Sequence, residues 1–307
     1  MYHSTGEKPL VVLLREAREV IEWAKSIGVV LPKNNNWAER ALNKLEPIAA
    51  QLDLKEQKKE FERHYSDPVE AQNNIADLTH LLFIRQNVGN QDIGILRKKL
   101  SLVMVGPDSV RQETAKNTKS RDARFELSIC AQLNHTRFHA VLHEPNPDVM
   151  ATRKKIRAAI ECKRIFSEKR LEKQINEGIH QLRTREGNKE SDQRIVFCDM
   201  TRAITSGMGH LHGDRQAVVD DLVKELNKWA EKIMGMFMHR HVTGIDAVVL
   251  VYQDYIESNS SEHRLTAVTQ QVAVINPNSP RRLRRKAERF ALKFNLQSQK
   301  YIKEFRK

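Results

Sequence analysis

Asp148, Glu161 and Lys163 are the residues of this sequence whose types and spacing best suit chemistry. They lie near the two ends of EPNPDVMATRKKIRAAIECKR, residues 144–164, which is typical of two β-strands joined by a basic turn. If the turn falls near residues 153–155, Asp148 comes close to the strand end that carries Glu161 and Lys163. The hairpin then brings two carboxylates and one ammonium group together.

The side chains of a strand alternate between two faces, so this hairpin has two chemically different sides. One face of the second strand carries small apolar residues, namely Ala158, Ile160 and Cys162. The other face carries Arg157, Ala159, Glu161 and Lys163. The alternation therefore predicts an apolar face turned to a core and a separate reactive face.

Two carboxylates on neighbouring strands suit Mg²⁺ or Mn²⁺, which prefer hard oxygen ligands and are seldom caged entirely by protein. Such a metal ion would polarise a phosphate and generate hydroxide, while Lys163 would orient water and offset developing negative charge. Basic neighbours would follow the backbone of a polyanion, and these are Arg153, Lys154, Lys155, Arg157 and Arg164. The plainer alternative is an exposed Glu161–Lys163 pair, with Asp148 capping a turn.

The segments around the hairpin alternate between helix and strand patterns. We expect helices over 121–134, 167–183 and 220–237, and strands over 139–144, 194–200, 246–256 and 264–276. This order predicts an α/β unit with a mixed β-sheet flanked by helices. A basic helix is expected after Pro280.

The first hundred residues show helix patterns and no motif that assigns them a function. Val11, Leu14, Arg18, Ile21 and Lys25 form a mixed stripe that Gly28 should end. We therefore expect an all-α N-terminal domain over residues 1–113, an α/β domain over 114–276 and a basic C-terminal helix over 277–307.

Pro147-Asp148 followed by Glu161-Cys162-Lys163 resembles the PD-(D/E)xK nuclease superfamily, which has the restriction-endonuclease-like fold. The resemblance covers roughly residues 121–276 and leaves out the N-terminal hundred. It implies that Asp148, Glu161 and the main-chain carbonyl of Cys162 bind the metal ion and that Lys163 is catalytic.

Many members of this superfamily carry two further polar residues on flanking helices. One is a glutamate on the helix before the sheet, for which Glu126 is the candidate catalytic residue and metal ligand. The other is a glutamine on the helix after the motif, for which Gln181 is the first candidate and Gln174 its competitor.

The resemblance implies a Mg²⁺- or Mn²⁺-dependent endonuclease that hydrolyses phosphodiester bonds, in DNA rather than RNA. Restriction, anti-phage defence and repair are the settings implied by the family. Two alternatives stay open: a non-catalytic nucleic-acid-binding protein that keeps the fold, and an effector-gated ribonuclease or toxin nuclease. A homodimer and an activating partner acting through the N-terminal domain also stay open.

Composition favours a globular protein with a polyanionic partner. The 307 residues are 40% hydrophobic and 30% charged, with a net charge of +13, and residues 281–307 hold eleven Lys and Arg against two Glu. Cys130, Cys162 and Cys198 show no metal-ligand spacing, which favours free thiols in the cytoplasm. No apolar run is long enough for a membrane span, so we expect no membrane partner.

Overall fold

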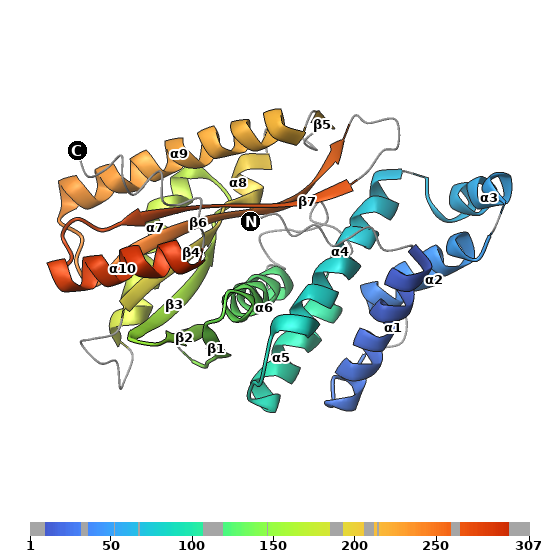
Figure 1. The fold of residues 1–307 in the computed structure, drawn as a ribbon, viewed down its shortest axis with the longest axis horizontal. Coiled ribbons are helices and arrows are strands. Elements are labelled where there is room, and N and C mark those ends of the chain that lie inside the picture. The colour runs from blue at the N-terminus through green and yellow to red at the C-terminus, as the bar shows by residue number, and fades with distance from the viewer. Residues whose placement is uncertain are drawn as a thin grey trace. The chain divides into compact units, whose positions relative to one another are not determined.

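The chain folds into two compact units (Figure 1). In the computed structural model, one unit contains the described residues up to Ala131 and the other those from Gln132 onward. The structure describes residues 10–31, 36–51, 53–66, 68–106, 119–145, 147–184, 193–205, 212–213, 215–258 and 265–294.

The first unit is helical, which confirms the prediction for the N-terminal region. Its helices are α1 (Leu10–Ser26), α2 (Trp37–Ala49), α3 (Leu54–His64), α4 (Pro68–Asn87), α5 (Ile93–Met104) and the first part of α6 (Lys119–His135). The side chains of Asn36, Asp53 and Asp92 accept hydrogen bonds from first-turn N–H groups of α2, α3 and α5. Each cap satisfies a donor that has no partner inside its helix.

Helix α1 buries a different stripe from the one expected. Val11 is 58% exposed, and the buried residues are Leu13, Leu14, Ala17, Val20, Ile21 and Ala24. These positions follow the i, i+3, i+4 spacing of an amphipathic helix, and the apolar stripe excludes Arg18 and Lys25. The predicted end of the helix is confirmed, because Gly28 takes a φ of +87° and its N–H bonds to the carbonyl of Lys25.

The second unit is built on a sheet to which its described residues contribute seven strands. Its strands are β1 (His139–Leu142), β2 (Val149–Arg153), β3 (Ile156–Arg164), β4 (Gln193–Asp199), β5 (His212–Gly213), β6 (Ala247–Ser258) and β7 (Leu265–Ile275). The order is β1-β2-β3-β4-β6-β5, and β7 pairs with β6. Pairing is antiparallel for β1–β2, β2–β3 and β6–β7, and parallel for β3–β4, β4–β6 and β5–β6. The predicted mixed sheet is therefore confirmed.

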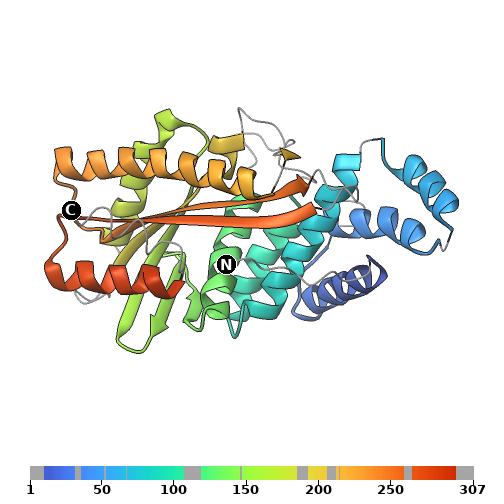
Figure 2. The same ribbon diagram turned by 45° about the horizontal axis from the view of Figure 1, so that its top comes forward.

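Helices cover both faces of this sheet (Figure 2). On one face, α7 (Glu168–Thr184) and α9 (Arg215–Arg240) pack on a core that includes Ala159, Val196 and Leu250. On the other face, α10 (Arg281–Phe294) packs through Phe290 and Phe294 on Phe197 of β4. A short helix, α8 (Thr201–Thr205), follows β4.

The boundary between the units lies further along the chain than residue 113. It falls within α6, because the two parts of that helix are held by different partners. The first part joins the helical unit through the Glu126–Lys99 ion pair and the His80–Ser128 contact. The last part joins the sheet unit, where both side-chain amide atoms of Asn134 bond to the backbone of Ala140.

The basic C-terminal helix forms part of the sheet unit. Helix α10 ends at Phe294 within the described part of the chain, and the rest of the predicted segment 277–307 after that residue lies outside it. None of the helices formed by described residues has the length and apolar character needed to cross a membrane.

Candidate active site

The β2–β3 hairpin places Asp148 beside the end of β3, as the sequence predicts. Arg153 pairs with Ile156 and Val149 with Ile160, so the turn consists of Lys154 and Lys155. Asp148 directly precedes β2, and its carboxylate Oδ2 accepts a hydrogen bond of 2.7 Å from the backbone N–H of Cys162. This bond fixes the Asp148 carboxylate next to the Glu161-Cys162-Lys163 motif.

Glu161 and Lys163 form an ion pair on the same face of β3. The Lys163 Nζ donates to Glu161 Oε1 over 2.9 Å. Both groups are withdrawn from water, since the Glu161 side chain is 1% exposed and that of Lys163 is 12% exposed. The other carboxylate oxygen of Glu161, Oε2, is buried and has no hydrogen-bond partner within the described structure. An unsatisfied buried carboxylate oxygen costs free energy, so this position suits a bound cation.

The electrostatics of the pair follow from burial. The pKa of Glu161 is raised to about 8, first by burial and then by the Asp148 carboxylate, while Lys163 acts in the opposite direction. For Lys163, burial alone would lower the pKa, but the Glu161 carboxylate more than offsets this and the pKa is raised. Lys163 therefore keeps its proton at neutral pH.

The predicted apolar face is confirmed, since Ala158 and Ile160 are fully buried, but the expectation that the opposite face stands apart from a core is wrong. Glu161 and Lys163 share their face of the sheet with Ala159 and with Val196 and Cys198 of β4, which belong to the core beneath α7 and α9. Because β3 is an inner strand with helices on both sides, each of its faces is covered. The ion pair thus lies at the edge of a core, and Asp148, like Lys163, is half-buried.

Helix α7 approaches this face closely at Gly178. A Cβ added there would lie 2.9 Å from Val196 Cγ2 and 3.6 Å from Lys163 Cε. Gln174 and Gln181 lie one turn before and one turn after Gly178, on the same side of the helix, and both are half-buried. Both glutamines are thus placed over the part of the sheet that holds Lys163, and both remain candidates for the glutamine that the resemblance implies.

The oxygen atoms around Asp148 and Glu161 could supply some of the ligands of a hard divalent cation and leave the rest to water. The Asp148 and Glu161 carboxylates are oxygen ligands, and the Cys162 carbonyl is directed to the same side of β3 as its N–H, toward Asp148. No group of three His, Cys, Asp or Glu side chains suited to a metal ion occurs among the described residues. Mg²⁺ commonly keeps several water ligands, so two carboxylates and a carbonyl suffice for it.

Glu126 has a different environment from the other predicted ligands. It lies on the first part of α6, in the helical unit, where it forms an ion pair with Lys99 of α5. Both side chains are largely buried, with exposed fractions of 14% and 8%. The carboxylate is therefore already compensated by a lysine, and its role as a metal ligand stays a prediction.

The predicted nucleic-acid-binding residues fall into four environments. Lys154 and Lys155 are exposed in the turn, while the Arg153 guanidinium stacks on Phe138 at 5.4 Å and donates to the carbonyl of Thr136. Arg157 is half-buried on the face of Glu161.

Arg164 is bound within the protein. Its Nε donates to Asp199 Oδ2 over 3.0 Å, and its side chain is 7% exposed. Its guanidinium also lies over the ring of Phe166, 5.2 Å from the centroid. Arg164 therefore has a structural role: it joins the end of β3 to Asp199 at the end of β4.

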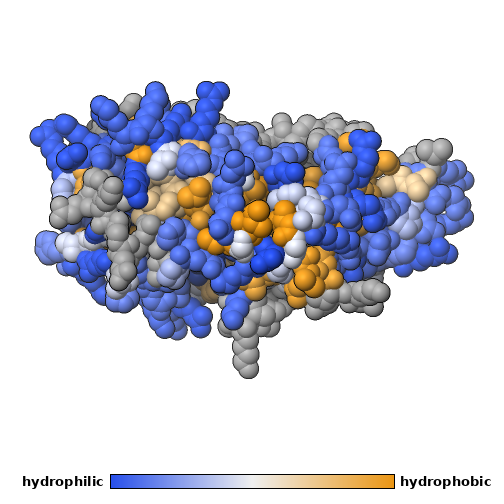
Figure 3. Space-filling model, turned by 90° about the horizontal axis from the view of Figure 1, so that it is seen from below, coloured by the Kyte–Doolittle hydropathy of each residue, from blue (hydrophilic) through white to orange (hydrophobic). Residues whose placement is uncertain are grey.

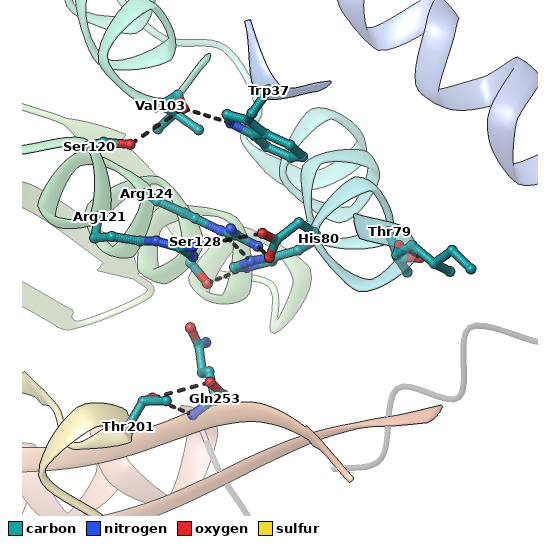
Figure 4. Close-up of polar contacts among 12 residues, drawn as sticks. Trp37, Thr79, His80, Val103, Ser120, Arg121, Arg124, Ser128, Thr201 and Gln253 are labelled. Carbon is teal, nitrogen blue, oxygen red and sulfur yellow. Dashed lines mark hydrogen bonds and ion pairs between the residues drawn. The ribbon is translucent and has the colours of Figure 1, made fainter. Parts of the chain in front are cut away.

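Sequence reasoning missed a polar group where the carboxyl end of β4 lies beside the middle of β6. Asp199 Oδ1 accepts from the backbone N–H of Thr201, while its Oδ2 holds Arg164. Thr201 Oγ1 lies 3.1 Å from both the carbonyl and the N–H of Gln253 (Figure 4). The signal was available, because an acidic residue at the last position of a buried strand marks the strand end where α/β proteins commonly bind ligands.

Sequence reasoning also missed a polar network between α4 and α6 in the helical unit (Figure 4). The Arg124 guanidinium lies 2.6 Å from Asp77 Oδ1 and donates to His80 Nδ1 over 3.0 Å. His80 Nε2 lies 3.0 Å from the Ser128 hydroxyl. Burial, followed by the nearby Arg124 charge, lowers the pKa of His80 to about 3, so the ring is neutral.

The three cysteines are free thiols, as expected. Burial raises the pKa of Cys130 and of Cys198 to about 12, which keeps both protonated and unreactive.

Comparisons of this chain with models of known families, with curated protein sequences and with solved structures return no match. The resemblance to PD-(D/E)xK nucleases therefore depends on its own residues and their arrangement.

Proposed function

We propose that this chain is a metal-dependent nuclease of the PD-(D/E)xK type that hydrolyses phosphodiester bonds, with DNA as the favoured substrate. One observation carries the proposal: the Asp148 carboxylate is held 2.7 Å from the Cys162 N–H, beside the buried Glu161–Lys163 pair. The element order from α6 to β7 around this hairpin supports a restriction-endonuclease-like fold.

The roles of the residues follow from their charges. Asp148, Glu161 and the Cys162 carbonyl would hold Mg²⁺ or Mn²⁺. When bound, that ion would polarise the scissile phosphate and lower the pKa of a bound water. Lys163, which keeps its proton in this environment, would orient the attacking water and stabilise negative charge that develops on the phosphate. A lysine donor preorganised in a site of low dielectric is more effective than one in water.

The substrate class follows from charge. The chain has a net charge of +13 and places Lys154 and Lys155 in the exposed turn of the same hairpin that carries the site. Such cations bind the phosphate backbone without reading its sequence.

A second candidate function is nucleic-acid binding without cleavage. The observation that favours it is burial: Glu161 is 1% exposed, and α7 approaches Lys163 at Gly178. If this arrangement persists when nucleic acid binds, the Glu161–Lys163 pair would stabilise the fold and would not reach a phosphate.

The deciding experiment compares wild type with Glu161→Gln and Lys163→Met, which keep side-chain size and so preserve packing. Plasmid, single-stranded DNA and RNA are incubated with each protein in Mg²⁺, Mn²⁺ or EDTA. We expect metal-dependent cleavage by wild type and a loss of at least about 100-fold in both variants, the usual effect of removing one catalytic donor.

Lys173→Met is the matched control. Lys173 lies 3.8 Å from Glu177 on the surface of α7, so this variant removes an exposed lysine of an ion pair in the same unit. It should cleave at the wild-type rate. Undiminished cleavage by Lys163→Met, with its folding verified by circular dichroism, would exclude the proposed site. Binding to DNA by a wild-type protein that cleaves none of the three substrates would favour the second function.

A further inference from the structure

The outward face of α10 carries a row of arginines and a lysine. The exposed cations are Arg281, Arg282, Arg285, Arg289 and Lys293. Four of them, Arg281, Arg285, Arg289 and Lys293, are spaced by four residues and so lie on one side of the helix. The row spans about 18 Å along the helix axis. Figure 3 shows hydrophilic side chains predominating at the end of the molecule where α10 lies.

These cations are not used to hold the protein together. Within the part of the chain that the structure describes, none of the five takes part in an ion pair or a hydrogen bond. Like charges four residues apart destabilise a helix, so the row carries a small cost for folding. A partner that brings negative charge would remove this cost.

The opposite side of α10 is fully occupied by the core. Phe290 lies 5.0 Å from Phe138, and Phe294 lies 5.3 Å from Phe197, measured between ring centroids. Ala287 and Ala291 are also buried. An amphipathic helix binds a membrane by inserting its apolar face. Because the apolar face of α10 is buried in the protein, its cations point to a soluble polyanion and not to a lipid surface.

We propose that the α10 row, defined as Arg281, Arg282, Arg285, Arg289 and Lys293, is a binding surface for the sugar-phosphate backbone of a DNA duplex. A row of about 18 Å is too long for a single phosphate group and fits consecutive phosphates of a chain. Binding through it is independent of sequence, because the cations contact phosphates and not base edges.

The row is separate from the candidate active site. Phe197, on which α10 packs, pairs in register with Cys162, whose side chain points away from the face of Glu161 and Lys163. The row therefore lies on the other side of the sheet and binds a part of the duplex away from the phosphate to be cleaved. Arg153, stacked on the same Phe138 that contacts Phe290, connects the row to the β2–β3 turn.

The test measures the affinity of the whole chain for a labelled 20-base-pair duplex in EDTA at several salt concentrations, where no cleavage occurs. We compare wild type with Arg285→Gln/Arg289→Gln. Losing two phosphate contacts should weaken binding by roughly tenfold or more at 0.1 M salt and reduce the slope of log K against log salt by about 1.8. The matched control is Lys224→Gln/Lys228→Gln, which removes two exposed cations from α9, each already paired with an acidic neighbour.

The control should bind within about twofold of wild type. A charge-preserving variant, Arg285→Lys/Arg289→Lys, should also retain binding, because phosphate contacts accept either cation. The proposal is overturned if the Gln variant binds as wild type does, if the α9 control loses as much, or if the Lys variant loses as much as the Gln variant. It is also overturned if anionic phosphatidylserine vesicles compete for the row better than the duplex does.

The binding part of this inference does not depend on the proposed nuclease activity. One consequence does rest on that activity. If the chain cleaves DNA, the Arg285→Gln/Arg289→Gln variant should have a higher KM and an unchanged kcat. A wild-type protein that binds duplex through α10 and cleaves nothing would contradict the proposed function alone.

Discussion

Asp148, Glu161 and Lys163 show how a few side chains acquire unusual properties from their position. The Asp148 carboxylate is held by a backbone N–H, and the Glu161–Lys163 pair is withdrawn from water. Breaking such a buried pair by removing one partner costs about 3–5 kcal/mol when the remaining charge stays uncompensated. The variants that test the site therefore need a measurement of stability beside that of cleavage.

Lys154 in the β2–β3 turn provides a prediction at the same scale. It takes a φ of +53°, in the left-handed region where a residue with a side chain is strained. Lys154→Gly should stabilise the fold by up to about 1 kcal/mol, seen as a higher urea midpoint, because glycine adopts this conformation freely. Lys155→Gly, which loses the same charge at a residue without a positive φ, should not stabilise. Equal effects of the two changes would mean that charge, and not backbone strain, determines the result.

Gly178 of α7 and Gly235 of α9 differ in the free space around them. A Cβ at Gly178 of α7 would lie 2.9 Å from Val196, whereas a Cβ at Gly235 of α9 would have no atom within 4 Å. Gly235→Ala should stabilise by about 0.5–1 kcal/mol, the usual gain in helix propensity.

Gly178→Ala should destabilise relative to Gly235→Ala by about 1–3 kcal/mol, because overpacking forces α7 away from β4. Thermal unfolding of the two variants beside wild type measures the difference. If the chain cleaves DNA, Gly178→Ala should also slow cleavage, since the helix moves where it covers Lys163. A stabilising Gly178→Ala would show that α7 can shift without cost.

The α4–α6 network gives the helical unit a dependence on pH. The pKa of His80 is lowered to about 3 in the folded state, below the unfolded value near 6.5. Between these values the unfolded chain binds the extra proton, so stability is fully present above pH 6.5 and falls as the pH decreases. The expected loss is up to about 2 kcal/mol at pH 5 relative to pH 7.

Chemical denaturation at several pH values measures this loss, with His80→Gln as the comparison. The variant should be less stable at pH 7 and should show a smaller decrease between pH 7 and 5. Asp77 titrates in a separate range, because its pKa is lowered: burial raises it, but Arg124 and Arg121 more than offset burial. Its contribution is lost below pH 3.8, so it does not affect the comparison. Parallel profiles for the two proteins would contradict the assignment to His80.

At the scale of the whole molecule, the division into two units within α6 affects which fragments fold. A fragment of residues 1–113 lacks Arg124 and Glu126, and it leaves Asp77 and Lys99 without the partners that compensate their charges. A fragment of residues 1–135 keeps them. We expect cooperative thermal unfolding of 1–135 by circular dichroism and a lower, broader transition for 1–113. Equal transitions would show that the first part of α6 is dispensable for the helical unit.

The hairpin and the glutamate on α6 illustrate how far sequence reasoning reached. The alternation of the strands and the basic turn predicted the pairing that places Asp148 at the Cys162 N–H, since both depend on residues close in sequence. Glu126 was also placed on the correct helix. Its ion pair with Lys99 could not be inferred, because no local pattern relates residues on two different helices.

The sequence by itself determined the types and order of the longer elements and the approximate position of the β2–β3 turn, because helix and strand periods and turn residues act locally. It did not reveal the short elements α8 and β5. Tertiary structure alone decided that Glu161 and Lys163 lie beneath α7, that Arg164 is held by Asp199, and that α10 turns its apolar side to Phe197. These contacts join segments far apart in the chain. Such contacts depend on how helices and strands pack against one another, and a short stretch of sequence does not contain this information.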